Sequence, residues 1–151
     1  MLLALVVWVG GIIFFAFVLA PTLFSVLPST QMAGNVVSPA LTRLHQFGLT
    51  AGLVLLACSL AYDRQRLARF NLFTATNVLV VLMLALTAIS QFGVTPRMRE
   101  LRAGPPATQA TQAEFDRLHA WSTRLEGGVL FLGLAVVVLM GRRGEKTAVS
   151  T

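Results

Sequence analysis

The chain has 151 residues, of which 56% are apolar and only 12% are charged. A chain this short and this apolar leaves no room for a soluble domain beside its hydrophobic segments. Its formal net charge of +6 comes mostly from arginines near the ends of those segments, a placement typical of anchoring to lipid headgroups, and we predict no nucleic-acid partner.

Four segments are long and apolar enough to cross a hydrocarbon core of about 30 Å. They lie at approximately residues 2–20, 39–62, 70–95 and 112–141. We therefore predict an all-α integral membrane protein, a four-helix bundle of up-and-down topology, in which residues 1–151 form one domain surrounded by the lipid bilayer. The first segment has no Lys or Arg before it, so we interpret it as a retained helix and not as a signal peptide.

An up-and-down topology puts both termini and the connection near residues 62–70 on one side of the membrane, called side A. The connections at residues 21–38 and 96–114 lie on the other side, called side B. Basic residues are equally numerous on the two sides, but those of side A cluster directly outside helix ends: Arg64, Arg66, Arg69, Arg142, Arg143 and Lys146. This clustering favours side A as cytoplasmic. We predict a multi-pass protein of the cell membrane with both termini in the cytoplasm.

The second segment begins with a sequence typical of a helix start. Ser38 is a good N-cap, and Pro39 suits the first helical position. Further along, Gly48 and Gly52 form a pair of small residues one helical turn apart. Such pairs allow close helix contact in membranes, and we expect this one to bring His45 into the interior of the bundle.

The fourth segment has two candidate capping boxes, Thr111 with Glu114 and Thr123 with Glu126. A cap at Thr123 would make Glu126 a structural acid. The uncharged run from 127 to 141 covers only about 22 Å, too short to span alone, so we favour the cap at Thr111. The resulting long helix carries His119, Thr123 and Glu126 on one stripe at spacings of three and four.

Polar side chains of the second, third and fourth segments fall at one depth. Counted from the side A ends, they lie within a layer about 10 Å thick. Ionisable residues inside a membrane are rare and usually functional. We therefore predict a polar pocket near the extracytoplasmic face that binds a small polar ligand. The predicted ligand-binding residues are His45, Gln91, Arg97, Ser122, Thr123 and Glu126.

The same layer offers a set of metal ligands. Imidazole and carboxylate groups from His45, His119 and Glu126 suit a Cu, Zn or Fe ion. Haem b held between the two histidines is an alternative, because the second and fourth helices of such a bundle are parallel. An offset of about 7 Å between the depths of the two histidines argues against haem.

A further alternative is a structural or accessory subunit of a larger membrane complex, or a homo-oligomer, in which the polar layer only fixes helix register. No catalytic residue is predicted, because the sequence contains no nucleophile with a base and an orienting group, no phosphate-binding glycine loop and no paired carboxylates. An enzymatic activity is neither indicated nor excluded. Cys58 is the single cysteine, so no internal disulfide forms.

Arginines gather at the side B end of the third segment. Arg97 follows Pro96 and forms a basic rim with Arg99 and Arg102. The rim is interpreted either as an anchor for headgroups or as an electrostatic funnel for an anionic ligand entering the pocket.

Short motifs along nearly the whole chain resemble those of transmembrane protein 205 and its bacterial relatives, which are grouped as a domain of unknown function. The motifs are Trp8-Val9-Gly10-Gly11, Ala20-Pro21 with Phe24, Leu44-His45 with Phe47-Gly48, Thr95-Pro96-Arg97-Met98, and Phe115 with Leu118-His119 and Ser122.

The resemblance implies a four-span membrane protein whose signature residues gather near one face. By that likeness the positions of interest are His45, Pro96, Arg97, His119 and Ser122. The animal member's link to platinum-drug resistance and vesicular export implies the handling of soft metals or small molecules. An asparagine often stands in the family where this chain has Glu126, which implies that the shared property of the position is hydrogen bonding.

Overall fold

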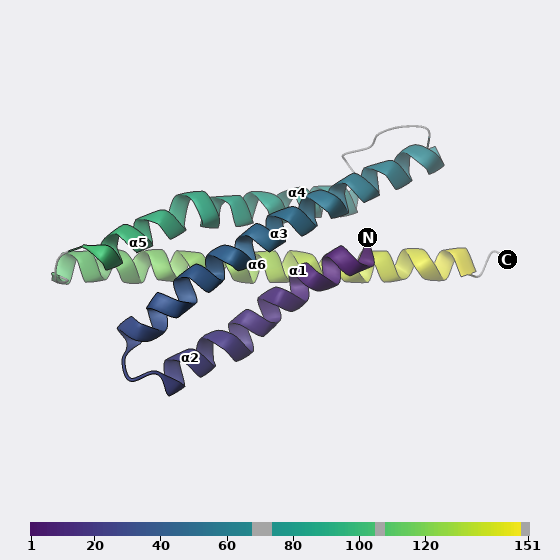
Figure 1. Ribbon diagram of the computed structural model, residues 1–151. Helices are drawn as coiled ribbons and strands as arrows, with labels where there is room; N and C mark the ends of the chain where they lie inside the picture. The colour runs from purple at the N-terminus through teal and green to yellow at the C-terminus, as the bar shows by residue number, and fades with distance from the viewer. Residues whose placement is uncertain (68–73, 105–107, 149–151) are drawn as a thin grey trace.

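Four long helical arms make up the part of the chain that the structure describes, and no strand occurs within it (Figure 1). The structure is a computed structural model that describes residues 1–67, 74–104 and 108–148, with only the backbone for residues 66–67 and 142–148. The first arm is α1 (Leu2–Phe14), the π-helix η1 (Phe15–Leu19) and α2 (Ala20–Val26), and the second is α3 (Thr30–Leu67). The third arm is α4 (Ala75–Ala88), the π-helix η2 (Ile89–Val94) and α5 (Thr95–Ala103), and the fourth is α6 (Gln109–Ala148).

The arms form a ring in chain order. Helix α1 packs on α3, α3 packs on α4, α4 packs on α6, and α6 closes the ring against α1. The N-terminus, the C-terminal end of α6, the C-terminal end of α3 and the start of α4 lie toward the same end of the bundle (Figure 1). The predicted all-α, up-and-down four-helix bundle is confirmed.

Within the described residues, four stretches are long and apolar enough to cross a membrane: Leu2–Val26, Thr30–Gln65, Ala75–Ala103 and Gln109–Gly141. Their outward faces carry large apolar side chains, such as Leu3, Phe17 and Phe131, that are 77%, 69% and 75% exposed. Apolar side chains on the outside of a helical bundle are covered by lipid in a bilayer. The protein is therefore a multi-pass membrane protein.

Two helices begin earlier than the sequence predicted. Helix α3 starts at Thr30, where the hydroxyl oxygen of Ser29 accepts from the backbone N–H of Met32, and Pro39 lies inside the helix. The prediction of Ser38 as its N-cap was wrong, because a proline within a membrane helix is tolerated when its neighbours satisfy the freed backbone groups. Helix α6 starts at Gln109, two residues before the predicted cap at Thr111, and runs without a break through Thr123 and Glu126. The long-helix prediction is confirmed, with Thr108 in place of Thr111 at the start.

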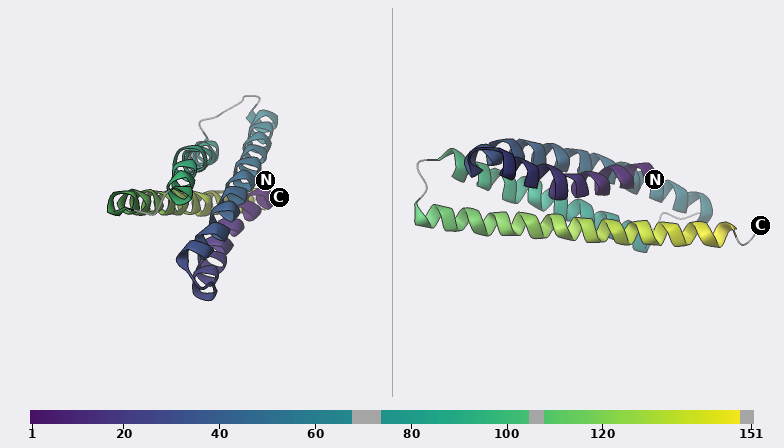
Figure 2. Two further views of the ribbon diagram at one scale, coloured as in Figure 1. Left: turned by 60° about the vertical axis from the view of Figure 1, so that its left-hand side comes forward. Right: turned by 90° about the horizontal axis from the view of Figure 1, so that it is seen from below.

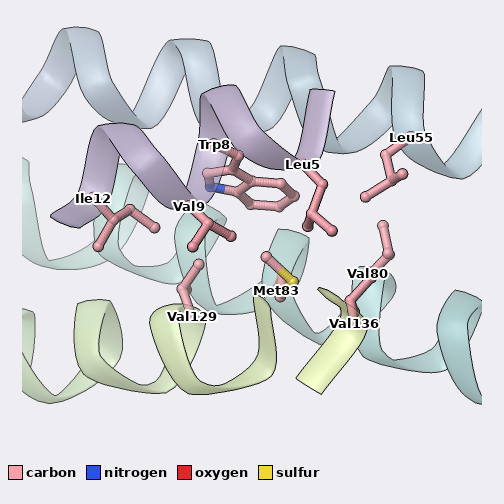
Figure 3. Packing of buried hydrophobic residues seen from close by; sticks show 9 residues of the cluster. All are labelled: Leu5, Trp8, Val9, Ile12, Leu55, Val80, Met83, Val129 and Val136. Carbon is pink, nitrogen blue, oxygen red and sulfur yellow. The ribbon is translucent and has the colours of Figure 1, made fainter. Parts of the chain in front are cut away.

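The apolar core fills the half of the bundle nearer side A. Figure 3 shows its members, which come from all four arms: Leu5, Trp8, Val9, Ile12, Leu55, Val80, Met83, Val129 and Val136. The indole of Trp8 lies directly over Gly48 and Gly52, since a Cβ atom at Gly48 would stand 2.5 Å from its Nε1. The expected close helix contact exists, and the side chain that occupies it is Trp8. His45, one turn from Gly48, is 1% exposed, as expected.

Toward side B the arms diverge. Helix α2 and the start of α3 lie together, apart from α5 and the start of α6 (Figures 1 and 2). The first two arms and the last two arms are therefore splayed apart toward side B, and the region between them is called the wedge. The polar layer lies at the narrow end of this wedge, where the arms come together.

Some of the sequence predictions fall on residues that the structure does not describe. The side chains of Arg66, Arg69, Arg142, Arg143 and Lys146, which carry the prediction of orientation, lie outside the described residues, as do residues 70–73 of the predicted third span. The cytoplasmic location of the termini therefore stays a prediction.

Candidate functional site

Three polar side chains from three arms meet in the interior. The Nδ1 atom of His45 on α3 lies 2.9 Å from Oε1 of Gln91 on η2, and its Nε2 atom lies 2.5 Å from Oε1 of Glu126 on α6. His45 is 1% exposed and the Glu126 side chain 17%. The expected meeting of these residues at one depth is confirmed. That they bind a ligand stays a prediction.

His45, Gln91 and Glu126, called the triad, are joined by two hydrogen bonds to one imidazole ring. Because Gln91 and Glu126 come from different helices, the buried ring links three arms of the bundle.

Local backbone structure positions Gln91. The π-helix η2 lies directly before Thr95 and Pro96, and a proline removes one backbone donor and crowds the carbonyl four residues earlier. The hydroxyl of Thr95 donates to the carbonyl of Ser90 at 2.8 Å, so the widened turn stays satisfied. Such π-bulges occur often at functional sites. Here the widened turn carries Gln91 to His45.

A cavity of about 350 Å³, called the inner cavity, lies in the wedge beside the triad. Its apolar wall comes mainly from the first two arms, and the members are Ile12, Phe15, Ala16, Ala20, Pro21, Phe24, Val37, Leu41, Leu44 and Met98. Its polar wall comes mainly from α6, with His119, Ser122, Thr123 and Glu126, and also includes Ser38, Thr95 and Arg102. The inner cavity is therefore apolar on one side and able to form hydrogen bonds on the other.

A second hollow of about 580 Å³, called the outer cavity, lies nearer the side B ends of the helices. It shares Phe24, Arg102 and His119 with the inner cavity. The rest of its wall is mostly polar and includes Thr30, Gln31, Thr111, Gln112 and Asp116. The two hollows are thus neighbours, with Arg102 and His119 between them.

Arg102, which the sequence placed in the basic rim but not among the ligand-binding residues, lines both cavities. It stands half-buried where α5 faces α3, and its Nη1 donates to the carbonyl of Gly34 at 2.6 Å. Its guanidinium also lies over the ring of Phe115, 5.1 Å from the centroid. The spacing of Thr95, Met98 and Arg102, which all line the inner cavity, is the helical signal that could have placed it on this face.

Arg97, which the sequence placed at the mouth of the pocket, lies elsewhere. Its Nε and Nη2 donate to the two carboxylate oxygens of Glu114 at 2.9 and 3.3 Å, and its Nη1 donates to Glu100 at 3.2 Å. Arg97 does not line either cavity. In this structure it ties α5 to α6, and Arg102 occupies the wall instead.

The residues predicted on α6 all line the inner cavity, and His119 also lines the outer cavity. Ser122 is buried and lines the inner cavity. The hydroxyl of Thr123 donates to the carbonyl of His119 in its own helix at 3.0 Å. His119 is exposed and stacks on Phe115, with the ring planes 4° apart. It lies seven residues, or about 10 Å along the helix, from Glu126.

The structure joins two of the three predicted metal ligands, His45 and Glu126, and not the third. Among the described residues no group of three or more His, Cys, Asp or Glu side chains is placed to hold a metal ion. The haem alternative meets a related difficulty, because both ring nitrogens of His45 already contact Gln91 and Glu126. An axial ligand needs one of these nitrogens free.

A second polar cluster lies at the side A end between α3 and α4. The carboxylate of Asp63, 4% exposed, accepts from Nδ2 of Asn77 at 3.0 Å and from the hydroxyl of Thr74 at 3.4 Å. Thr74 also caps the start of α4. This cluster lines neither the inner nor the outer cavity and ties together two helices that follow one another in the chain.

The fold and the site together define a four-span membrane protein with a polar layer and a cavity at one end of its bundle. The chain belongs to the family described as a domain of unknown function (DUF4149), which it matches over residues 3–105. His45 and Gln91 lie inside the matched region, and α6 with Glu126 follows it. Comparisons with curated proteins and with solved structures found no match.

Proposed function

We propose that this protein binds a small molecule in the inner cavity, within the membrane and near side B. The observation that carries the proposal is the combination of an apolar wall with a polar wall that ends at the triad. Ligand sites are commonly cavities of about 300–1,000 Å³ with mostly apolar walls and a few convergent polar groups. The inner cavity, at about 350 Å³, falls in this range.

In this proposal each polar residue has a part. Ser122 and Glu126 form the polar wall that faces the ligand, and His45 with Gln91 holds Glu126 in place. The apolar side chains of the first two arms contact the rest of the ligand.

A small molecule is favoured over a metal ion as the ligand, because His119 would have to leave Phe115 and cross about 10 Å to join His45 and Glu126. The resemblance to transmembrane protein 205 fits small-molecule handling. With both termini cytoplasmic, as the placement of basic residues predicts, the cavity opens to the extracytoplasmic side. We also propose that residues 1–151 form a single membrane domain.

Mass spectrometry of the protein extracted in a mild detergent tests this function. We expect a small molecule to co-purify with the wild type and to be lost from Ala20→Phe and from Met98→Trp, which fill the inner cavity from different arms. Phe131→Trp, on the outward face, is the matched control and should retain it. Equal amounts of the molecule in all four proteins, or none in any of them, would contradict the proposal.

A second candidate is an accessory subunit or homo-oligomer in which the triad only fixes helix register. The observation in its favour is that both ring nitrogens of His45 have protein partners. Polar contacts between membrane helices do serve this purpose. Co-purification of a stoichiometric protein partner, with no small molecule bound, would favour this candidate.

A further inference from the structure

The two cavities together suggest what kind of molecule the site takes. We infer that the ligand is an anionic amphiphile, whose apolar chain occupies the inner cavity and whose phosphate or carboxylate group binds Arg102 at the boundary with the outer cavity. This inference deepens the proposed function and rests on it.

The first support is the state of Arg102. Among the side chains that the structure describes, no carboxylate pairs with its guanidinium, in contrast to Arg97, which contacts two. The carbonyl of Gly34 takes one donor, and a guanidinium has five. Burial of a cation without an anion is costly. An anionic ligand would supply the missing partner.

The second support is how firmly the guanidinium is held. Nη1 donates to the carbonyl of Gly34 on one side, and the ring of Phe115 lies beneath the group on another. Gly34 is also what makes room, because a Cβ atom there would stand 2.6 Å from Nη2. A guanidinium already held in place loses less conformational freedom when it binds an anion.

The third support is the match of each cavity to one half of an amphiphile. The inner cavity has its apolar wall from the first two arms, whereas the outer cavity has mostly polar residues around Arg102. Two acidic groups also face this space. Asp116 lines the outer cavity and accepts from Nε2 of Gln112 at 3.0 Å, whereas Glu126 lines the inner cavity and contacts His45. Asp116 is therefore the carboxylate expected to repel an anionic group bound in the outer cavity.

A matched set of probes tests the inference on the full chain in a neutral detergent. The probes are hexadecyl phosphate, uncharged hexadecyl maltoside and inorganic phosphate, with affinities measured by calorimetry. We expect saturable binding of hexadecyl phosphate and much weaker binding of the other two. Inorganic phosphate binding as tightly as hexadecyl phosphate would show a site for free phosphate and overturn the amphiphile.

Variants then locate the contact. Arg102→Gln should lower the affinity for hexadecyl phosphate by about tenfold or more, which is the loss expected for one charge-assisted hydrogen bond. Gly34→Ala keeps the charge but displaces the guanidinium, so it should also weaken binding. Asp116→Asn should strengthen it. Arg97→Gln is the matched control, since it removes an arginine of the same helix that does not line either cavity.

The outcomes separate the two proposals. If Ala20→Phe abolishes binding but Arg102→Gln does not change it, or if the maltoside binds as tightly as the phosphate, the cavity binds a ligand and the anionic class is wrong. Equal losses in Arg97→Gln and Arg102→Gln would indicate a diffuse basic surface and would also overturn the inference. If Ala20→Phe and Met98→Trp leave all binding unchanged, the proposed function itself fails.

Discussion

Toward side A the interior of the bundle is filled by a cluster of nine buried apolar side chains from all four arms, centred on Trp8. Toward side B the same arms diverge, and the space between them holds the triad and two cavities. The two halves differ in how their interiors are filled. Close packing of apolar side chains stabilises the half nearer side A, whereas the half nearer side B has unfilled volume next to groups that can form hydrogen bonds. We expect substitutions in the first half to change stability and those in the second to change binding.

The largest expected effect is at the centre of the apolar half. Trp8→Ala should lower the free energy of unfolding by about 3–5 kcal/mol, because it removes a buried aromatic side chain and leaves a cavity over Gly48 and Gly52. Denaturation of the protein in mixed micelles would measure the change. Trp121→Ala is the control, since Trp121 is 52% exposed. Equal losses for the two tryptophans would contradict the packing described here.

The polar cluster at side A should behave as part of the structure. Asp63→Ala removes the acceptor for Asn77 and Thr74 and should cost about 1–3 kcal/mol of unfolding free energy. Asp63→Asn keeps an acceptor oxygen and should cost less. Neither should alter the small molecule that co-purifies. Loss of that molecule from Asp63→Ala, at unchanged stability, would show that the two ends of the bundle do not divide their roles in this way.

Substitutions in the triad, which lies between the two halves, test whether its polar contacts contribute to stability. Glu126→Leu should cost about 1–2 kcal/mol, the range of one polar contact between membrane helices. Glu126→Gln should cost less, because an amide at this position can still form a hydrogen bond with Nε2 of His45. Combining Glu126→Leu with His45→Leu in a double-mutant cycle should give a coupling energy of about 0.5–2 kcal/mol. Independent effects of the two substitutions would mean that the contact at 2.5 Å contributes nothing to stability.

The smallest expected effect is at Thr123, although the sequence places it among the ligand-binding residues. Its hydroxyl donates to the carbonyl of His119 in the same helix, so Thr123→Val should change the unfolding free energy by no more than about 0.5 kcal/mol. Binding of hexadecyl phosphate should stay the same within error. Ser122→Val, one residue earlier and facing the inner cavity, is the comparison and should weaken that binding. A stronger effect at Thr123 than at Ser122 would reverse the assignment of the two hydroxyls.

The sequence predicted the meeting of His45, Gln91 and Glu126 because depth in a membrane helix follows from counting residues. The rise per residue is constant, and each arm has to cross the same thickness of hydrocarbon. It also predicted that α6 reaches back through Glu126, since the apolar run after it is too short. Counting put His119 at the edge of the same layer, but it lies about 10 Å along α6 from Glu126 and stacks on Phe115, a contact that counting could not predict.

What the amino-acid sequence determined by itself was therefore the fold class, the number of arms and the depth of the polar residues, because these depend on hydrophobic length alone. The tertiary structure decided which side chains share a wall. It directed Arg97 to Glu114 and Arg102 to Gly34, it put Trp8 over the small residues of α3, and it left the inner cavity open where the arms diverge. These outcomes depend on helix rotation and crossing, which are set by contacts between residues far apart in the chain.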